Sequence, residues 1–251
     1  MDEELAPLKS ATPRPAVPAG VIAVVRASTA AQARTIVRGL VVAAVPAIEL
    51  TMTVPDAVRI IAEFAASVPP AGTVLGAGTV LGAGTVLGAG TVLGAGTVLG
   101  AGTVLDPEAC SACTEAGAAF IVSPVTDAAV LGRAHRGGVP YVGGALTPTE
   151  VLASMRAGSD AVKLFPVGSV GGAGYLRALR QPLPGLRAVV SGGIAAREVA
   201  GYLAAGAHAV CLGGALIDRA AARRGDVDAV AAHARRVLDE ITEADGHAED
   251  H

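Results

Sequence analysis

Two charged side chains stand inside runs that are otherwise apolar, and both types can do chemistry on a carbonyl group. Lys163 lies in Ala-Val-Lys-Leu-Phe-Pro, and Lys9 is the only other lysine in the chain. Burying the charge of a lysine is costly, whereas a desolvated lysine has a lowered pKa and can form a Schiff base. Glu49, in Ala-Ile-Glu-Leu-Thr, is either the structural partner of that lysine or a proton shuttle. Together they indicate imine chemistry, with a structural salt bridge as the alternative.

Glycine pairs near the ends of two later apolar runs could bind an anion. They are Ser191-Gly192-Gly193 and Gly213-Gly214. Backbone N–H groups at such positions can cradle a phosphate, although Gly-Gly is often only a turn. Arg26 ends the first apolar run, so it either supplies a cation for an anionic substrate or forms a surface ion pair.

Apolar runs that read as buried strands alternate with segments long enough for crossover helices. Eight such units predict a parallel sheet covered on both faces and closed into a (β/α)8 barrel, an α/β fold in one domain over 1–251. In this architecture the catalytic groups lie at the C-terminal ends of the strands. The expected strands are 21–27, 47–53, 100–105, 120–125, 140–146, 161–167, 188–194 and 209–217, and the expected helices include 30–43, 55–67, 107–116, 148–157 and 195–205.

Helix-start signals support this order. Thr147-Pro148-Thr149-Glu150 is a capping box with proline at the first helical position. Asp106-Pro107-Glu108 offers a second cap directly after 100–105. We expect one amphipathic helix over 218–238, an N-terminal arm over 1–18 and a frayed polar tail over 243–251.

Residues 76–105 are five copies of Gly-Ala-Gly-Thr-Val-Leu, preceded by a partial copy from Ala71. In an extended chain this even period places Gly, Gly and Val on one face and Ala, Thr and Leu on the other. We interpret the repeat over 71–105 as the expansion of a single strand motif and expect the last copy to form the third strand. A stacked solenoid is the alternative.

Composition excludes several classes of protein. The 251 residues are 52% apolar and carry a net charge of −3, which gives no basic surface for nucleic acid. Three cysteines do not make a disulfide framework and favour a reducing, cytoplasmic location. Cys110 and Cys113 spell C-x-x-C inside an expected helix without other ligands, so we expect no metal site. The acidic N-terminus does not resemble a signal peptide, and the charge-free 64–105 stretch is too rich in glycine for a membrane span.

The motifs resemble those of the class I 2-keto-3-deoxy-6-phosphogluconate (KDPG) and 4-hydroxy-2-oxoglutarate (KHG) aldolases. The resemblance covers about 21–217 once the extra repeats are set aside. It is carried by Ile-Ala-Val-Val-Arg (22–26), Ile-Glu-Leu-Thr-Met-Thr-Val-Pro (48–55), Gly-Ala-Gly-Thr-Val-Leu (100–105), Phe-Ile-Val-Ser-Pro (120–124), Leu-Thr-Pro-Thr-Glu (146–150), Val-Lys-Leu-Phe-Pro (162–166) and Ser-Gly-Gly-Ile (191–194).

The resemblance implies a lyase of carbohydrate metabolism, in the Entner-Doudoroff pathway, that cleaves a keto acid to pyruvate and an aldehyde without metal or organic cofactor. Lys163 would attack the keto group and Glu49 would shuttle protons. Thr103 would contact the pyruvoyl carboxylate, and Phe165 would line the pyruvate pocket. The aldehyde would be glyceraldehyde 3-phosphate from KDPG or glyoxylate from KHG. The resemblance also implies a homotrimer.

The chain departs from the family pattern at three substrate-binding positions. Thr53 stands where many members carry an arginine thought to hold the carboxylate. Gly213-Gly214 replace a Gly-Ser whose hydroxyl can hold phosphate, and Gly143-Gly144 replace a Pro-Gly. The missing serine leaves an unphosphorylated substrate open. Two alternatives remain, a phosphate-binding isomerase or epimerase that uses a base without an imine, and an inactive assembling barrel.

Overall fold

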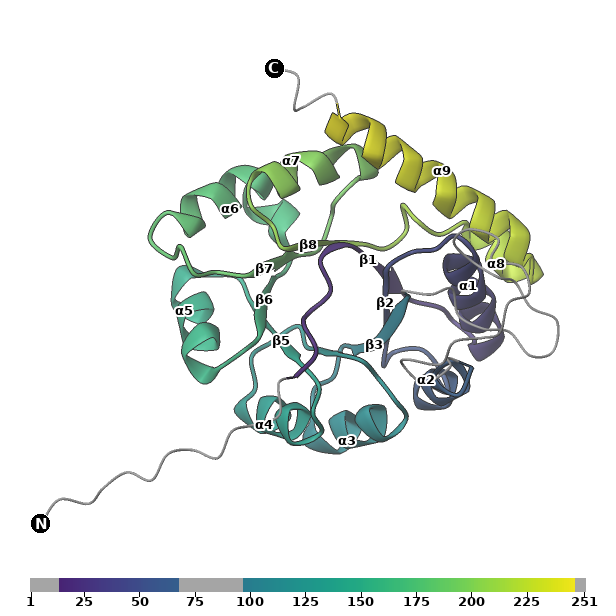
Figure 1. Cartoon of the computed structure of the whole chain (residues 1–251), viewed down its shortest axis with the longest axis horizontal. Coiled ribbons are helices and arrows are strands. Elements are labelled where there is room, and N and C mark those ends of the chain that lie inside the picture. The colour runs from purple at the N-terminus through teal and green to yellow at the C-terminus, as the bar shows by residue number, and fades with distance from the viewer. Residues whose placement is uncertain (1–13, 68–96, 247–251) are drawn as a thin grey trace, which may run out of the picture.

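A computed structural model describes residues 14–67 and 97–246, and in them eight parallel strands close into a barrel in sequence order (Figure 1). This confirms the predicted (β/α)8 architecture. The strands are β1 (Gly20–Val25), β2 (Ala47–Thr51), β3 (Val98–Gly102), β4 (Ile121–Val122), β5 (Tyr141–Ala145), β6 (Ala161–Leu164), β7 (Ala188–Val190) and β8 (Ala209–Leu212).

The strands are buried on both faces, which explains their continuous apolar sequences. Side chains alternate along each strand between the barrel interior and the layer under the helices. In β1, for example, Ile22 and Val24 belong to the interior cluster, whereas Ala23 and Val25 pack with the helices. The same alternation in β2 and β6 directs Glu49 and Lys163 into the interior, because their neighbours Ile48, Leu50 and Leu164 belong to the outer layer.

Helices surround the strands, and several begin at the predicted caps. Thr147 and Glu150 form the capping box, and Asp106 accepts a hydrogen bond from Ala109 N. The helices are α1 (Ala30–Val42), α2 (Ala57–Ala65), α3 (Pro107–Glu115), α4 (Ala128–Arg136), α5 (Pro148–Ala157), α6 (Gly172–Arg180), α7 (Val199–Ala204), α8 (Arg219–Arg224) and α9 (Val227–Gly246), with short 3-10 turns at Val167–Val170 and Ala196–Glu198.

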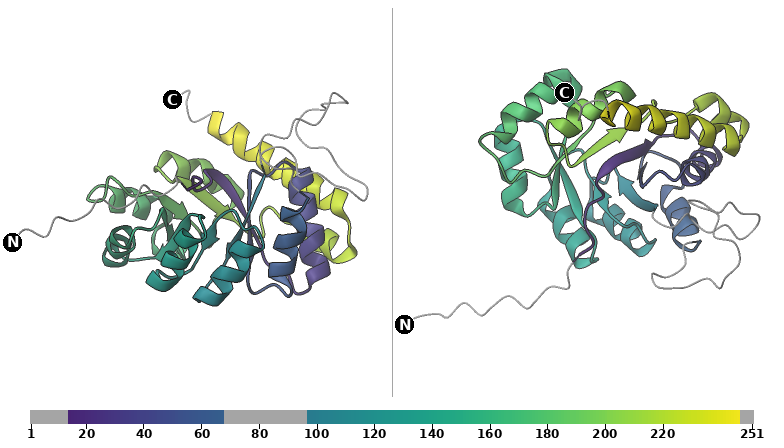
Figure 2. Two further views of the ribbon diagram at one scale, coloured as in Figure 1. Left: turned by 60° about the horizontal axis from the view of Figure 1, so that its bottom comes forward. Right: turned by 45° about the horizontal axis from the view of Figure 1, so that its top comes forward.

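The structure corrects the predicted C-terminal helix. The single helix expected over 218–238 is two helices, because Gly225 adopts a left-handed conformation (φ +76°) and ends α8, and Asp226 then caps α9. α9 continues to Gly246, beyond the expected start of the tail, and lies against α1 and α8 (Figure 2). Residues 247–251 lie outside the described residues.

Strand three begins two residues earlier than predicted and ends earlier as well. β3 takes Val98 and Leu99 from the fourth copy of the repeat and Gly100 to Gly102 from the fifth. Thr103 has φ +57°, which breaks the extended conformation after Gly102. The expected alternation holds within β3, where Leu99 and Ala101 pack outward. The copies within 68–96 lie outside the described residues. In the sequence they stand between α2 and β3.

The described part of the N-terminal arm covers the N-terminal end of the barrel. Val17 is buried in the interior cluster, and its carbonyl lies 3.0 Å from His208 Nε2 beside β8. Arg14 Nη2 donates to Asp160 Oδ1 at 3.0 Å, immediately before β6. The arm therefore closes the end of the barrel opposite the expected catalytic face (Figure 1).

Candidate active site

The structure brings together the two residues that the sequence singled out. Lys163 Nζ lies 3.2 Å from both carboxylate oxygens of Glu49. The two residues are only 5% and 1% exposed, and they come from strands on opposite parts of the barrel. A lone buried ammonium or carboxylate is strongly unfavourable, so each charge requires the other.

The pair controls its own protonation. Burial is the largest single influence and lowers the pKa of the Lys163 ammonium, but the charge and hydrogen bond of Glu49, with a contribution from Cys211, together raise it above its ordinary value. The resting site is therefore an ion pair. If Glu49 accepted the lysine proton, the site would hold a neutral amine beside a protonated carboxyl group.

Two glycines of β3 give the interior side chains their space, and sequence reasoning did not assign them this role. A Cβ at Gly102 would lie 2.1 Å from Glu49 Oε1, and one at Gly100 would lie 2.5 Å from the Phe120 ring. The signal was present in the sequence, because Gly-x-Gly has the period of one strand face. Gly102 is thus a positioning residue for the carboxylate.

Three threonines stand where β2 and β3 end. Thr51 Oγ1 donates to the carbonyl of Val25 at 3.1 Å, which ties β2 to β1. The exposed Thr53 follows in a turn, and its Oγ1 lies 2.8 Å from Thr51 Oγ1. Thr103 is half-buried and keeps a left-handed backbone that a β-branched residue rarely adopts. Such strain concentrates at functional sites.

Phe165 and Arg26 lie beside the ion pair. The Phe165 ring centroid is 5.9 Å from Lys163 Nζ, and the residue is 36% exposed. The positive charge of Arg26 lowers the pKa of the Lys163 ammonium. This influence is smaller than those of burial and of Glu49. The exposed Arg26 forms no ion pair with the residues that the structure describes. Of the two predicted roles for Arg26, the surface ion pair is therefore absent from the described part of the chain.

The glycine pairs follow β7 and β8, which are neighbouring strands. Gly192 has φ +96°, and a Cβ there would lie 2.9 Å from Pro166 Cα, so only glycine fits. The N–H groups of Gly193 and Gly214 donate no hydrogen bond within the described residues. Gly213 begins the turn after β8 by accepting from Leu216 N.

Ser191 and Cys211 occupy the same barrel interior. Ser191 is buried directly after β7. Burial raises the pKa of the Cys211 thiol to about 12, so it stays protonated, and the hydroxyl of Ser191 opposes that rise only slightly. Cys110 and Cys113 are free and buried in α3, and burial raises the pKa values of their thiols to about 11 and 12. Among the described residues, no three His, Cys, Asp or Glu side chains gather as a metal site.

At Gly143, a predicted site residue, the side-chain direction points away from the barrel interior. A Cβ there would lie 2.7 Å from the hydroxyls of Thr126, Ser154 and Ser159, which are bonded in a row behind β5. Its neighbour Gly144 aligns with Lys163 in the sheet. The absence of a side chain at Gly143 therefore serves packing against α5.

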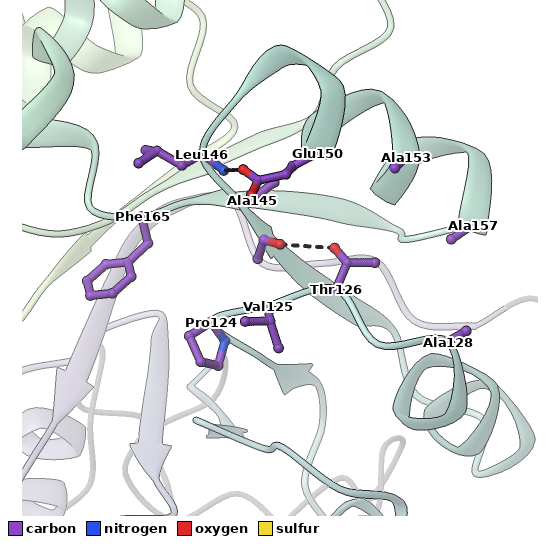
Figure 3. Close-up of a pocket in the computed structure, with 11 residues that line it drawn as sticks. Pro124, Val125, Thr126, Ala128, Ala145, Leu146, Glu150, Ala153, Ala157 and Phe165 are labelled. Atoms are coloured by element: carbon purple, nitrogen blue, oxygen red, sulfur yellow. Dashed lines mark hydrogen bonds between the residues drawn. The ribbon is translucent and has the colours of Figure 1, made fainter.

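A hollow of about 480 Å³ lies at the ends of β4 and β5 and against α5, with Phe165 on its wall (Figure 3). Its polar groups are already engaged, since Thr126 Oγ1 donates to Gly144 O at 3.0 Å and Glu150 Oε2 accepts from Leu146 N at 2.9 Å. The walls that remain are mainly apolar, and neither reactive side chain is among them. The lining residues are Pro124, Val125, Thr126, Ala128, Gly144, Ala145, Leu146, Glu150, Ala153, Ala157 and Phe165.

In comparisons with known proteins, the following two relatives are both named as aldolases of phosphorylated sugar acids. The chain is 35% identical over 144 residues to 2-dehydro-3-deoxy-phosphogluconate aldolase of Pseudomonas aeruginosa, covering 57% of this chain and 65% of that protein. The chain thus spans just under two thirds of that curated relative. It is 31% identical over 205 residues to a probable 2-dehydro-3-deoxy-6-phosphogalactonate aldolase of Rhizobium meliloti, covering 81% of this chain and 84% of that one.

A solved structure supports the fold. KDPG aldolase from Legionella pneumophila, with pyruvate captured as a covalent carbinolamine, superimposes with a TM-score of 0.70 at 20% identity, covering 87% of this chain and 94% of that one. No helix in the described segments is long and apolar enough to cross a membrane. The model of the KDPG and KHG aldolase family matches residues 16–233, and the chain belongs to that family.

Proposed function

We propose that this protein is a class I aldolase that cleaves a 2-oxo acid to pyruvate and an aldehyde. The observation that carries the proposal is the buried pair of Lys163 and Glu49, with 3.2 Å between the amine and each carboxylate oxygen. A nucleophilic amine beside a general acid–base is the arrangement that imine formation requires. An isomerase that uses only a base has no need of the lysine.

The proposed reaction begins when Glu49 takes the proton of the Lys163 ammonium. The neutral amine attacks C2 of the substrate and forms a carbinolamine, and protonated Glu49 gives its proton to the departing hydroxyl, so water and an iminium result. The carboxylate then takes the proton of the C4 hydroxyl while the bond between C3 and C4 breaks. The aldehyde leaves, and the bond electrons form an enamine. Glu49 returns the proton to C3, and water hydrolyses the iminium to pyruvate and free lysine.

The remaining residues divide between the two ends of the substrate. Phe165, whose ring centroid lies 5.9 Å from Lys163 Nζ, would line the pyruvate pocket, Thr103 would contact the pyruvoyl carboxylate, and Arg26 would supply a cation. The free N–H groups of Gly193 and Gly214 offer donors for a phosphate. We propose KDPG, which yields glyceraldehyde 3-phosphate, and KHG, which yields glyoxylate, as substrates, and expect no cofactor.

A cytoplasmic homotrimer remains our proposal for the assembly. Val125 (50% exposed) and Phe165 (36% exposed) are large apolar side chains at the hollow of Figure 3, and burying such surface against another copy is favourable. Light scattering on the purified protein tests this, and a mass of a single chain of 24.5 kDa would contradict it.

Borohydride reduction in the presence of pyruvate tests the imine. We expect mass spectrometry to show one adduct, equal to pyruvate less one water plus two hydrogens, on a peptide that contains Lys163. Lys163→Ala should abolish the adduct, whereas Lys9→Ala, which removes the only other lysine, should retain it. A folded parent without an adduct would refute the proposed function.

A further inference from the structure

Arg219 begins α8, and its charged group lies over the turn that follows β8. A Cβ at Gly214 would lie 3.6 Å from Arg219 Nη2, so the guanidinium group stands beside the place where Gly214 has no side chain. The residue is exposed, and it forms no ion pair within the part of the chain that the structure describes. The neighbouring carboxylate of Asp218 is engaged elsewhere, since its Oδ1 accepts from Ala220 N and Ala221 N at 2.9 Å each.

Two backbone N–H groups lie at the same end of the barrel as this guanidinium. Gly214 follows β8 and Gly193 follows β7, and neither N–H donates a hydrogen bond within the described segments. β7 and β8 pair in parallel, with Val190 opposite Val210, so the two turns leave neighbouring strands on the same side. Free N–H groups beside an unpaired guanidinium are the donors that bind a phosphate group.

Contacts connect these donors to the reacting lysine. A Cβ at Gly192 would lie 3.0 Å from Phe165 Cδ2, and the centroid of that ring is 5.9 Å from Lys163 Nζ. Because Gly193 follows Gly192 directly, the first of the free N–H groups stands beside the ring that borders the lysine. A substrate bound at Lys163 can therefore extend past Phe165 to these donors.

We infer that Arg219 is a specificity-determining residue that binds the phosphate of the substrate together with the N–H groups of Gly193 and Gly214. The inference rests on the proposed aldolase function and narrows its substrate class, because the released aldehyde then carries a phosphate. Of the two proposed substrates it favours KDPG, since the glyoxylate released from KHG has no phosphate. The guanidinium supplies the full positive charge that backbone N–H groups lack.

The test compares aldol addition of pyruvate to glyceraldehyde 3-phosphate and to glyceraldehyde, which differ only in the phosphate. The readout is the ratio of their kcat/KM values within each variant, so a general loss of activity cancels. We expect the parent to prefer the phosphorylated aldehyde. Arg219→Gln should lower the ratio about five- to fiftyfold, the loss of a charge-assisted hydrogen bond at a site open to water. Added KCl should lower the ratio of the parent more than that of Arg219→Gln, since salt screens the pairing.

Arg223→Gln is the matched control. Arg223 lies one helical turn further along α8, is exposed and loses the same charge, so its ratio should stay at the parent value. Borohydride trapping of pyruvate should be unchanged in both variants, because pyruvate has no phosphate. Trapping therefore shows that each variant keeps its reactive Lys163.

Three outcomes would overturn the inference. They are a parent that does not prefer the phosphorylated aldehyde, an unchanged ratio in Arg219→Gln, and an equal fall in Arg223→Gln, which would mean that only the general positive charge of α8 matters. The trapping experiment separates the two proposals. A parent that forms no pyruvate adduct refutes the aldolase itself, whereas a trapped and active parent with any of these three outcomes refutes only the role of Arg219.

Discussion

At the scale of single residues, the ion pair makes opposite demands on its members. Lys163 must lose a proton to react, yet Glu49 raises the pKa of the ammonium above its ordinary value. In the proposed mechanism this conflict is resolved because the same carboxylate that stabilises the ammonium also accepts its proton. In that mechanism the proton stays on Glu49, which is only 1% exposed, and is available to the departing hydroxyl.

Glu49→Gln separates the two roles of the carboxylate. The amide cannot accept the proton, so we expect turnover to fall about 10²- to 10⁴-fold. Burial would then act on Lys163 without the opposing carboxylate, so the pKa of the ammonium would fall. The pH profile of pyruvate trapping should therefore shift to lower pH even as turnover drops. Trapping rates between pH 5 and 10 measure this, and a profile that matches the parent would contradict the electrostatic role of Glu49.

The residue types were sufficient to predict this pair from the sequence, since a charge inside an apolar strand requires a partner. They did not reveal that the Thr51 hydroxyl lies 2.8 Å from that of Thr53 and 3.1 Å from the carbonyl of Val25, because Val25 belongs to another strand. The packing role of Gly143 was not visible in the sequence for a similar reason. Ser154 in α5 and Ser159 just after it lie next to Gly143 in space. No local sequence pattern links Gly143 to these two serines.

At the scale of elements, β3 contributes to the site because its inward positions are glycines without side chains. Its two inward glycines leave space for an aromatic ring at one level and for the catalytic carboxylate at the next, with close approaches of 2.5 and 2.1 Å for an added Cβ. The alternation of the strand was predictable from the repeat, but its first and last residues were not. The repeat has no internal landmark, and the end of β3 depends on the backbone of Thr103.

Gly102→Ala and Gly100→Ala form a matched pair of tests on this strand. Both add one methyl group to the same face. The first should displace Glu49, lower turnover and shift the pH profile of trapping in the same direction as Glu49→Gln. The second should crowd Phe120 and lower the free energy of unfolding by about 1–3 kcal/mol without that pH shift. Urea unfolding and trapping profiles of both variants distinguish them, and a profile for Gly102→Ala identical to that of Gly100→Ala would argue against a positioning role.

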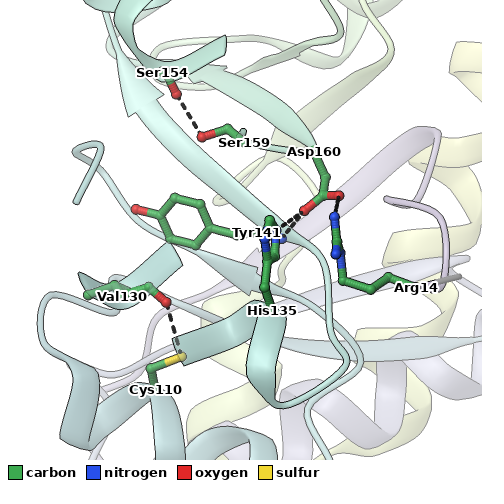
Figure 4. Close-up of polar contacts among 8 residues, drawn as sticks. All are labelled: Arg14, Cys110, Val130, His135, Tyr141, Ser154, Ser159 and Asp160. Atoms are coloured by element: carbon green, nitrogen blue, oxygen red, sulfur yellow. Dashed lines mark hydrogen bonds and ion pairs between the residues drawn. The ribbon is translucent and has the colours of Figure 1, made fainter. Parts of the chain in front are cut away.

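At the scale of the whole molecule, the two ends of the barrel have different tasks. The C-terminal end holds the reactive groups, and the N-terminal end is closed by the arm. Asp160 joins three segments there (Figure 4), because it accepts from Arg14 at 3.0 Å and from Tyr141 N at 2.9 Å, and it lies 2.7 Å from His135 Nε2. The arm, the end of α4 and the starts of β5 and β6 therefore depend on one carboxylate.

This network predicts how stability depends on pH. Burial alone would raise the pKa of Asp160, but hydrogen bonds from Tyr141 N, His135 and Arg14 lower it further than burial raises it. A carboxyl whose pKa is depressed by folding stabilises the native state above its unfolded pKa, about 3.9, and that stability is lost as the pH falls through the folded value. We therefore expect Asp160→Asn to lower the free energy of unfolding by about 1–3 kcal/mol at pH 7.

The difference between parent and Asp160→Asn should begin to shrink below about pH 4, where the carboxyl of the unfolded chain takes up a proton, and should be lost as the pH falls through the lower pKa of the folded state. Urea unfolding at pH 7 and pH 3 measures it, with Asp239→Asn, on the exposed face of α9, as the control expected to change stability by less than about 0.5 kcal/mol. Because the network lies at the end of the barrel away from the reactive pair, folded Asp160→Asn should still trap pyruvate at neutral pH. A stability difference that stays constant from pH 7 to pH 3 would mean that Asp160 acts through packing and not through its charge.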